Sequence, residues 1–83
     1  MEKNNKRIAA VLITVKKDSP EIFTINKTLG EFSSEIISRQ GLSLPSKSFN
    51  IISIIIDSDV NTINALAGKI GKFKDADIKT LIK

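Results

Sequence analysis

The chain has 83 residues, of which 41% are hydrophobic and 27% charged, and its formal net charge is +4. We expect one domain over residues 1–83, with residues 1–5 flexible. Cysteine and histidine are both absent, which excludes disulfides, thiol chemistry, most zinc and nickel sites and histidine-based acid–base catalysis. No apolar run approaches the roughly 20 residues that span a bilayer, and no signal-peptide pattern begins the chain. We therefore expect a soluble, cytoplasmic protein with no membrane partner.

Residues 7–17 (RIAAVLITVKK) predict a first strand that is largely apolar on both faces. Asp18-Ser19-Pro20-Glu21 is typical of a helix start, with Ser19 as N-cap and Pro20 at the first helical position. Apolar residues then recur at three- and four-residue steps and predict an amphipathic helix that ends at Gly41. Its apolar stripe consists of Ile22, Ile25, Leu29, Phe32 and Ile36.

The second half of the chain predicts two strands, a helix and a last strand. Residues 42–47 read as a short strand at a sheet edge, because Pro45 cannot donate a ladder hydrogen bond. Residues 49–57 (FNIISIIID) predict a strand that is apolar on both faces. Ser58 and Asp59 offer caps for a helix over about 60–73, and residues 76–83 predict the last strand. The apolar face of this helix is Ile63, Leu66, Ala67 and Ile70, and the last strand places Ile78 and Ile82 on one side.

The order β-α-β-β-α-β predicts an α+β, ferredoxin-like fold: a two-layer sandwich with two helices on one face of a four-stranded antiparallel sheet. This topology puts the two strands that are apolar on both faces in the middle. Lys16 and Asp57 indicate the register, because a charge costs less on the side away from the helices. The predicted core under the helices is Ala9, Val11, Ile13, Val15, Ile52, Ile54 and Ile56.

The other face of the sheet would then be an exposed apolar surface larger than soluble monomers usually carry. We expect a second copy of the chain to cover it, giving a homodimer or homotetramer. The predicted oligomer interface is Ile8, Ala10, Leu12, Thr14, Phe49, Ile51, Ser53 and Ile55.

Signals of an enzyme are weak. Gly68 and Gly71 belong to the second helix and not to a phosphate-binding loop, and Asp57 and Asp59 are better explained by helix capping than by paired acid–base catalysis. We predict no catalytic residue, no metal ligand and no cofactor. Polar residues near strand ends and helix starts are candidates for binding a small effector between subunits, or are simply caps and surface residues. They are Asp18, Ser19, Ser58, Asp59, Asn61 and Asn64.

Nucleic-acid binding is the alternative function. RNA-recognition modules with this strand order stack bases on aromatics of the central strands, where this chain offers Phe49 alone. The other phenylalanines, Phe23, Phe32 and Phe73, are expected in or near the core. A direct nucleic-acid-binding regulator would instead use surface lysines around the second helix, namely Lys69, Lys72 and Lys74.

Residues 59–71 (DVNTINALAGKIG) follow the pattern D-x-x-T-I-x-A-L-x-G-K-[IL]-G. On this motif, and on similarity along nearly the whole chain, the sequence resembles the iron-only hydrogenase system regulator family, relatives of the ACT domain and of the C-terminal domain of the nickel-responsive repressor. The resemblance implies an ACT-like, homo-oligomeric transcriptional regulator linked to hydrogenase genes. It brings no nickel site, because histidine and cysteine are missing, and Glu21 follows Pro20 where amino-acid-binding ACT domains usually have glycine. The sequence thus predicts a non-enzymatic, oligomeric ACT-like regulatory module that senses a small effector or serves as an assembly scaffold.

Overall fold

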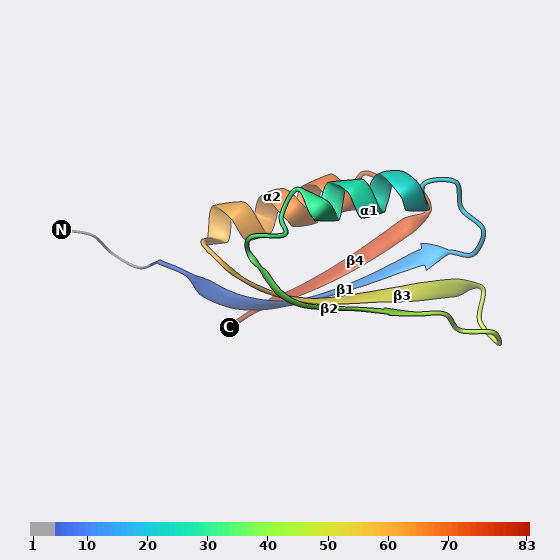
Figure 1. Cartoon of the computed structure of the whole chain (residues 1–83), viewed down its shortest axis with the longest axis horizontal. Helices are drawn as coiled ribbons and strands as arrows, with labels where there is room; N and C mark the ends of the chain where they lie inside the picture. Colours follow the sequence, from blue (N-terminus) through green and yellow to red (C-terminus); the bar gives the residue numbers. More distant parts are fainter. Residues whose placement is uncertain (1–4) are drawn as a thin grey trace.

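The computed structural model describes residues 5–83. Two helices lie on one face of a four-stranded antiparallel sheet with the strand order β2-β3-β1-β4 (Figure 1). This is the predicted ferredoxin-like α+β fold. Flexibility is predicted for residues 1–5, of which residues 1–4 lie outside the described residues. The elements are β1 (Arg7–Lys16), α1 (Ile22–Gly30), β2 (Ile36–Leu42), β3 (Phe49–Ser58), α2 (Val60–Gly71) and β4 (Ala76–Ile82).

The core lies between the helices and the two central strands, and the predicted register is confirmed. Every residue predicted to face the helices from β1 and β3 is at most 7% exposed. Antiparallel pairing brings these residues together, for example Val11 opposite Ile54 and Ile13 opposite Ile52. The helices close the core with Ile25, Leu29, Ile63, Leu66 and Ile70, all fully buried.

The first helix is shorter than its apolar spacing predicted. It ends at Gly30 and is followed by a turn, in which Phe32 still packs into the core. Ile36, assigned to the helical stripe, instead starts β2, and Gly41 lies in β2 instead of capping the helix. Gly30 lowers the stability of the helix. Phe32 and Ile36 are four residues apart, as they would be on one face of a helix, but in the structure a turn lies between them. Ser19 is not the N-cap either, because Glu21 holds that position.

The second strand lies at a sheet edge as predicted, but earlier in the chain. It covers Ile36–Leu42, and the segment 43–48, including Pro45, forms the turn that leads to β3. The pairing shifts register between Ile36 and Ser38, so Ile37 sits in a bulge and is 60% exposed. β2 ends before Pro45, because proline has no backbone N–H to donate to a neighbouring strand.

The second helix and last strand follow the prediction closely. Asp59 caps α2 by accepting a hydrogen bond from the Thr62 backbone N–H at 2.8 Å. Ile78 and Ile82 of β4 both pack against the core. Phe32 is buried and Phe73 packs against the core, but Phe23 is 80% exposed on α1, so its expected place in the core is wrong. Within residues 5–83, the helices are too short or too polar to cross a membrane.

Candidate functional site: the open face of the sheet

The face of the sheet that points away from the helices carries four of the six large hydrophobic side chains that are exposed among residues 5–83, and we call it the open face. Side chains alternate along each strand, and the pairing registers fix which residues share this side. In Figure 1 it is the lower side of the sheet, opposite α1 and α2. Its apolar members are Ile8, Ala10, Leu12, Leu42, Phe49, Ile51, Ile55 and Leu81.

All eight residues predicted for the oligomer interface lie on the open face. Ile8 and Leu12 keep 42% and 44% of their surface exposed, while Phe49, Ile51 and Ile55 are half-buried by their strand neighbours. The role of these residues in assembly stays a prediction. Sequence reasoning missed two further members, Leu42 and Leu81, which are 44% and 72% exposed. The outward alternation of Asp77, Lys79 and Leu81 in β4 could have revealed the second of them.

Large and small side chains alternate across the two central strands of the open face. Small Ala10 lies opposite large Ile55, large Leu12 lies opposite small Ser53, and Thr14 lies opposite Ile51. The small residues leave a shallow hollow of about 240 Å³ on this face. Its lining includes Ala10, Leu12, Ser53, Lys79 and Leu81. The surface is thus a regular pattern of projections and depressions.

Charged residues frame the apolar area instead of interrupting it. Asp57 pairs with Ile8 at one end of the central strands, and Lys16 pairs with Phe49 at the other. On the β4 side, Asp77 and Lys79 lie beside Thr14 and Leu12. This arrangement of an apolar centre within a polar rim is typical of protein interfaces.

The six effector candidates form two groups at opposite ends of the sheet. Asp18 and Ser19 follow the last residue of β1, whereas Ser58 pairs with Arg7 at the first. Asp59, Asn61 and Asn64 belong to the start of α2 next to Ser58. One subunit therefore does not bring the six together in a single site.

Asp18 and Ser19, the two candidates at the end of β1, have roles in the local structure of the subunit. Ser19 is 6% exposed; its Oγ donates to Asp75 Oδ2 at 2.7 Å and accepts from the Glu21 N–H at 3.1 Å. Glu21 Oε1 in turn accepts from the Asp75 N–H at 2.9 Å. Asp18 is exposed with a φ of 62°, a left-handed conformation that aspartate tolerates better than most residues. These contacts join the start of α1 to the turn before β4.

The group at the start of α2 borders an open cleft of about 450 Å³. Asn5, Arg7, Asp59, Val60 and Asn61 contribute to its lining, whereas the candidates Ser58 and Asn64 do not. The side chain and the backbone of Thr62 both form hydrogen bonds with Asp59. These bonds, of which the side-chain bond has the larger effect, hold the pKa of Asp59 below its ordinary range. The cleft thus presents a carboxylate, an amide and a guanidinium, groups that can bind a small polar molecule.

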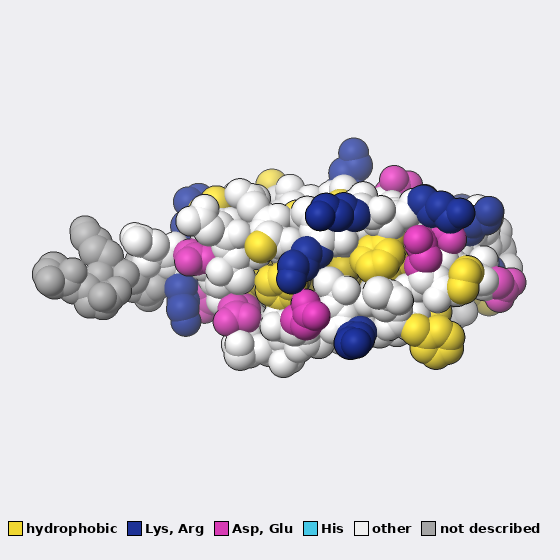
Figure 2. Space-filling model, turned by 90° about the horizontal axis from the view of Figure 1, so that it is seen from above, with side chains coloured by type: hydrophobic (Ala, Val, Ile, Leu, Met, Phe, Trp, Pro, Cys, Tyr) yellow, Lys and Arg dark blue, Asp and Glu magenta, His cyan; other side chains and the backbone are white. Residues whose placement is uncertain are grey.

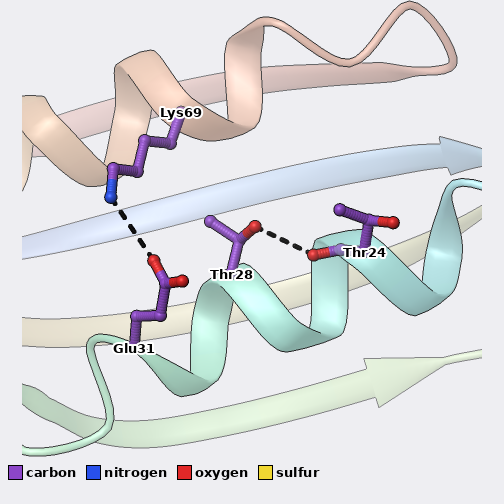
Figure 3. A network of polar contacts seen from close by, with 4 residues as sticks. All are labelled: Thr24, Thr28, Glu31 and Lys69. Atoms are coloured by element: carbon purple, nitrogen blue, oxygen red, sulfur yellow. Dashed lines mark hydrogen bonds and ion pairs between the residues drawn. The ribbon is translucent and has the colours of Figure 1, made fainter.

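The outer surface of the helices carries both signs of charge. Figure 2 shows Lys and Arg side chains interspersed with Asp and Glu over this side of the molecule. Lys69 of α2 pairs with Glu31, beyond α1, at 3.3 Å (Figure 3). The Lys69 ammonium also lies 5.7 Å from the centre of the Phe32 ring. Among residues 5–83, no three acidic side chains lie close enough together to hold a metal ion.

Comparison with known proteins adds a family and a related structure. The family model described as "TM1266-like: Iron-only hydrogenase system regulator, putative" matches residues 7–80. The chain is also similar to the solved structure of an uncharacterized protein, TM1266 from Thermotoga maritima, at 30% identity and a TM-score of 0.88. That likeness covers 93% of this chain and 96% of the other. No curated protein matches.

Proposed function

Because this chain belongs to the TM1266-like family of iron-only hydrogenase system regulators, we propose that it is a non-enzymatic regulatory module that works as an oligomer. Two or more copies associate through the open face and respond to a small effector bound near the subunit boundary. The observation that carries the proposal is the open face itself, with Ile8, Leu12, Leu42 and Leu81 each at least 42% exposed in the single subunit.

The size of the open face supports association. The two central strands have ten residues each and the two edge strands have seven each. At about 4.8 Å between strands and about 3.3 Å per residue, the four-stranded sheet is about 19 Å wide and about 23 to 33 Å long. Stable interfaces bury about 800 Å² on each partner, which is of the same order. Burying the face would remove from water a surface that a monomer has no means of covering.

The cleft at the start of α2 is the best supported place for an effector. It unites Asp59 and Asn61 with Arg7, whose Nε also donates to the Lys83 carbonyl at 2.8 Å. Arg7 begins β1, which supplies four of the predicted interface residues. A ligand held by Arg7 would therefore act on the end of a strand that takes part in assembly.

Direct nucleic-acid binding remains the untested alternative. It would need Lys69, Lys72 and Lys74 to present their charges together. Lys69 is instead paired with Glu31, and both signs of charge share the helix side (Figure 2). A regulator of this design would control other components through its assembly or its ligand, with transcriptional control being one such route.

Light scattering on the full chain at micromolar concentration tests the proposal, and a dimer or tetramer is the expected result. A thermal-shift screen with metabolites on the same samples tests the effector: saturable stabilisation that is insensitive to salt is expected. A stable monomer would remove the assembly from the proposal. An electrophoretic shift of DNA or RNA with steep salt dependence would favour the nucleic-acid alternative instead.

A further inference from the structure

We propose that two copies stack their open faces with β1 lying antiparallel on β1 of the other copy, so that Leu12 and Ile55 enter the spaces above the small side chains Ala10 and Ser53 of the other copy. This inference rests on the proposed function, because it specifies how the oligomer is built. It assigns the partner as a second copy of this chain and fixes which residues meet. The argument starts from the order of sizes along the two central strands.

The sizes alternate in both directions across the open face. Along β1 they run Ile8, Ala10, Leu12, Thr14, so that large and small follow one another. Ala10, Leu12 and Thr14 each lie opposite a β3 residue of the opposite size, as in the pairs Ala10–Ile55 and Leu12–Ser53. A surface with this chequered pattern fits a copy of itself once one copy is displaced by one position.

A two-fold axis gives this displacement when it lies in the interface, perpendicular to the strands, midway between the Ala10–Ile55 and Leu12–Ser53 pairs. Ala10 then meets Leu12 of the other copy, and Ser53 meets Ile55 of the other copy. Both contacts occur twice, as two-fold symmetry requires. The hollow of about 240 Å³ that Ala10 and Ser53 help to line is the depression that receives a projecting side chain.

The neighbouring arrangement is poorer in both packing and charge. An axis through the Leu12–Ser53 pair would place Leu12 on Leu12 and Ser53 on Ser53, leaving empty space beside the serines, which forfeits van der Waals contacts. It would also place Lys79, which lies opposite Leu12, on Lys79 of the other copy. Like charges facing one another across an interface oppose association.

The proposed arrangement brings opposite charges together at the β4 side. The Lys83 N–H donates to the Ile8 carbonyl at 2.8 Å, so Lys83 continues β4 beside Ile8, while Asp77 lies opposite Thr14. Stacking about the proposed axis puts Asp77 over Lys83 of the other copy, and it puts Lys79 over Leu81 of the other copy and not over a second lysine. Aligned sheets cross at an angle within about 30°. The long lysine side chain can span the separation from Asp77 that this angle introduces.

Exchanging the sizes at two positions of β1 tests the arrangement. We expect Ala10→Leu to weaken self-association by about tenfold or more, because it fills the depression that Leu12 of the other copy occupies. Adding Leu12→Ala to it exchanges projection and depression, and we expect the double variant to recover most of the affinity. Sedimentation equilibrium measures both changes, and far-UV circular dichroism checks the fold.

Ala65→Leu is the matched control, because Ala65 is exposed on α2 and its enlargement should leave self-association unchanged. If Ala10→Leu is rescued by Ile55→Ala and not by Leu12→Ala, β1 of one copy lies on β3 of the other copy and the proposed axis is wrong. If Ala10→Leu has no effect on a dimeric protein, the copies meet elsewhere and the inference falls. In the first case the proposed association through the open face stands; in the second case only an oligomer built on another surface stands, and a monomeric wild type would remove both proposals.

Discussion

Asp59 performs a structural task in the place where an effector could bind. Its carboxylate accepts the Thr62 backbone N–H at 2.8 Å and so caps α2, yet the residue is exposed and borders the cleft with Arg7 and Asn61. Hydrogen bonds from the Thr62 side chain and, second, from its backbone N–H favour the ionised carboxylate and so lower the pKa of Asp59. A ligand that bound this carboxylate would therefore act directly on the start of α2.

The lowered pKa of Asp59 predicts how the cap depends on pH. Its contribution is complete above the ordinary aspartate pKa of about 3.9 and is lost as the pH falls through the lower folded-state pKa. We expect Asp59→Ala to lower the melting temperature by a few degrees at pH 7, with the difference from wild type vanishing in strong acid. Thermal unfolding followed by circular dichroism measures both.

Asp59→Asn is the control for this prediction, because asparagine also caps helices but carries no titratable carboxyl. It should keep most of the stability at pH 7 and lack the acid-dependent part. Identical losses of stability in the wild type and Asp59→Asn between about pH 5 and pH 2 would show that the cap adds nothing to the pH dependence.

At the scale of elements, a lysine of the turn after β1 makes three of the hydrogen bonds that hold the segment between β2 and β3. The Lys17 backbone N–H donates to the Ser48 carbonyl at 3.0 Å, and Lys17 Nζ donates to the carbonyls of Leu44 and, at 2.9 Å, Lys47. Lysine satisfies carbonyl groups that would otherwise depend on water. Lys17 therefore fixes the position at which residues 43–48 leave the sheet.

Replacing Lys17 with methionine should loosen this segment without unfolding the sheet. The apolar stem is retained while the donors to Leu44 and Lys47 are lost, so we expect faster hydrogen exchange and proteolysis within residues 43–48. The cost to global stability should be about 1 kcal/mol or less. Lys27→Met, at an exposed position of α1, is the control; equal exchange in both variants would contradict the assignment.

Four of the six elements could be predicted from the sequence with nearly correct bounds, because hydrophobic alternation and caps identify them locally. The boundary between α1 and β2 could not. Phe32 and Ile36 are four residues apart, a helical spacing that in the structure spans a turn. The open face was predicted on β1 and β3 from the charges of Lys16 and Asp57. Leu42 and Leu81 were missed, because their side depends on pairing with other strands.

For the whole molecule, the two faces of β3 predict separate effects of substitution on assembly and on folding. Ile51 and Ile55 lie on the open face, whereas Ile54 is 1% exposed in the core. We expect Ile51→Asp or Ile55→Asp to dissociate the oligomer into folded subunits, and Ile54→Asp to unfold the subunit, because a buried charge without a partner is strongly destabilising. Light scattering and circular dichroism on the three variants distinguish the outcomes.

The same loss of fold in all three variants would show that the open face belongs to the folding core of the subunit. A fold and a mass like the wild type's in both surface variants would place the contact between copies on a different surface.

The bulge at Ile37 has a consequence for how far association can proceed. A sheet edge with regular, unpaired backbone groups is a template for strands of other chains, and bulges and lysines make such an edge less suitable. The β2 edge is irregular between Ile36 and Ser38, and the β4 edge carries Lys79. Growth by adding strands to the sheet is thereby discouraged, while stacking about a two-fold axis closes on itself. The fold thus favours particles of defined size over open-ended fibres.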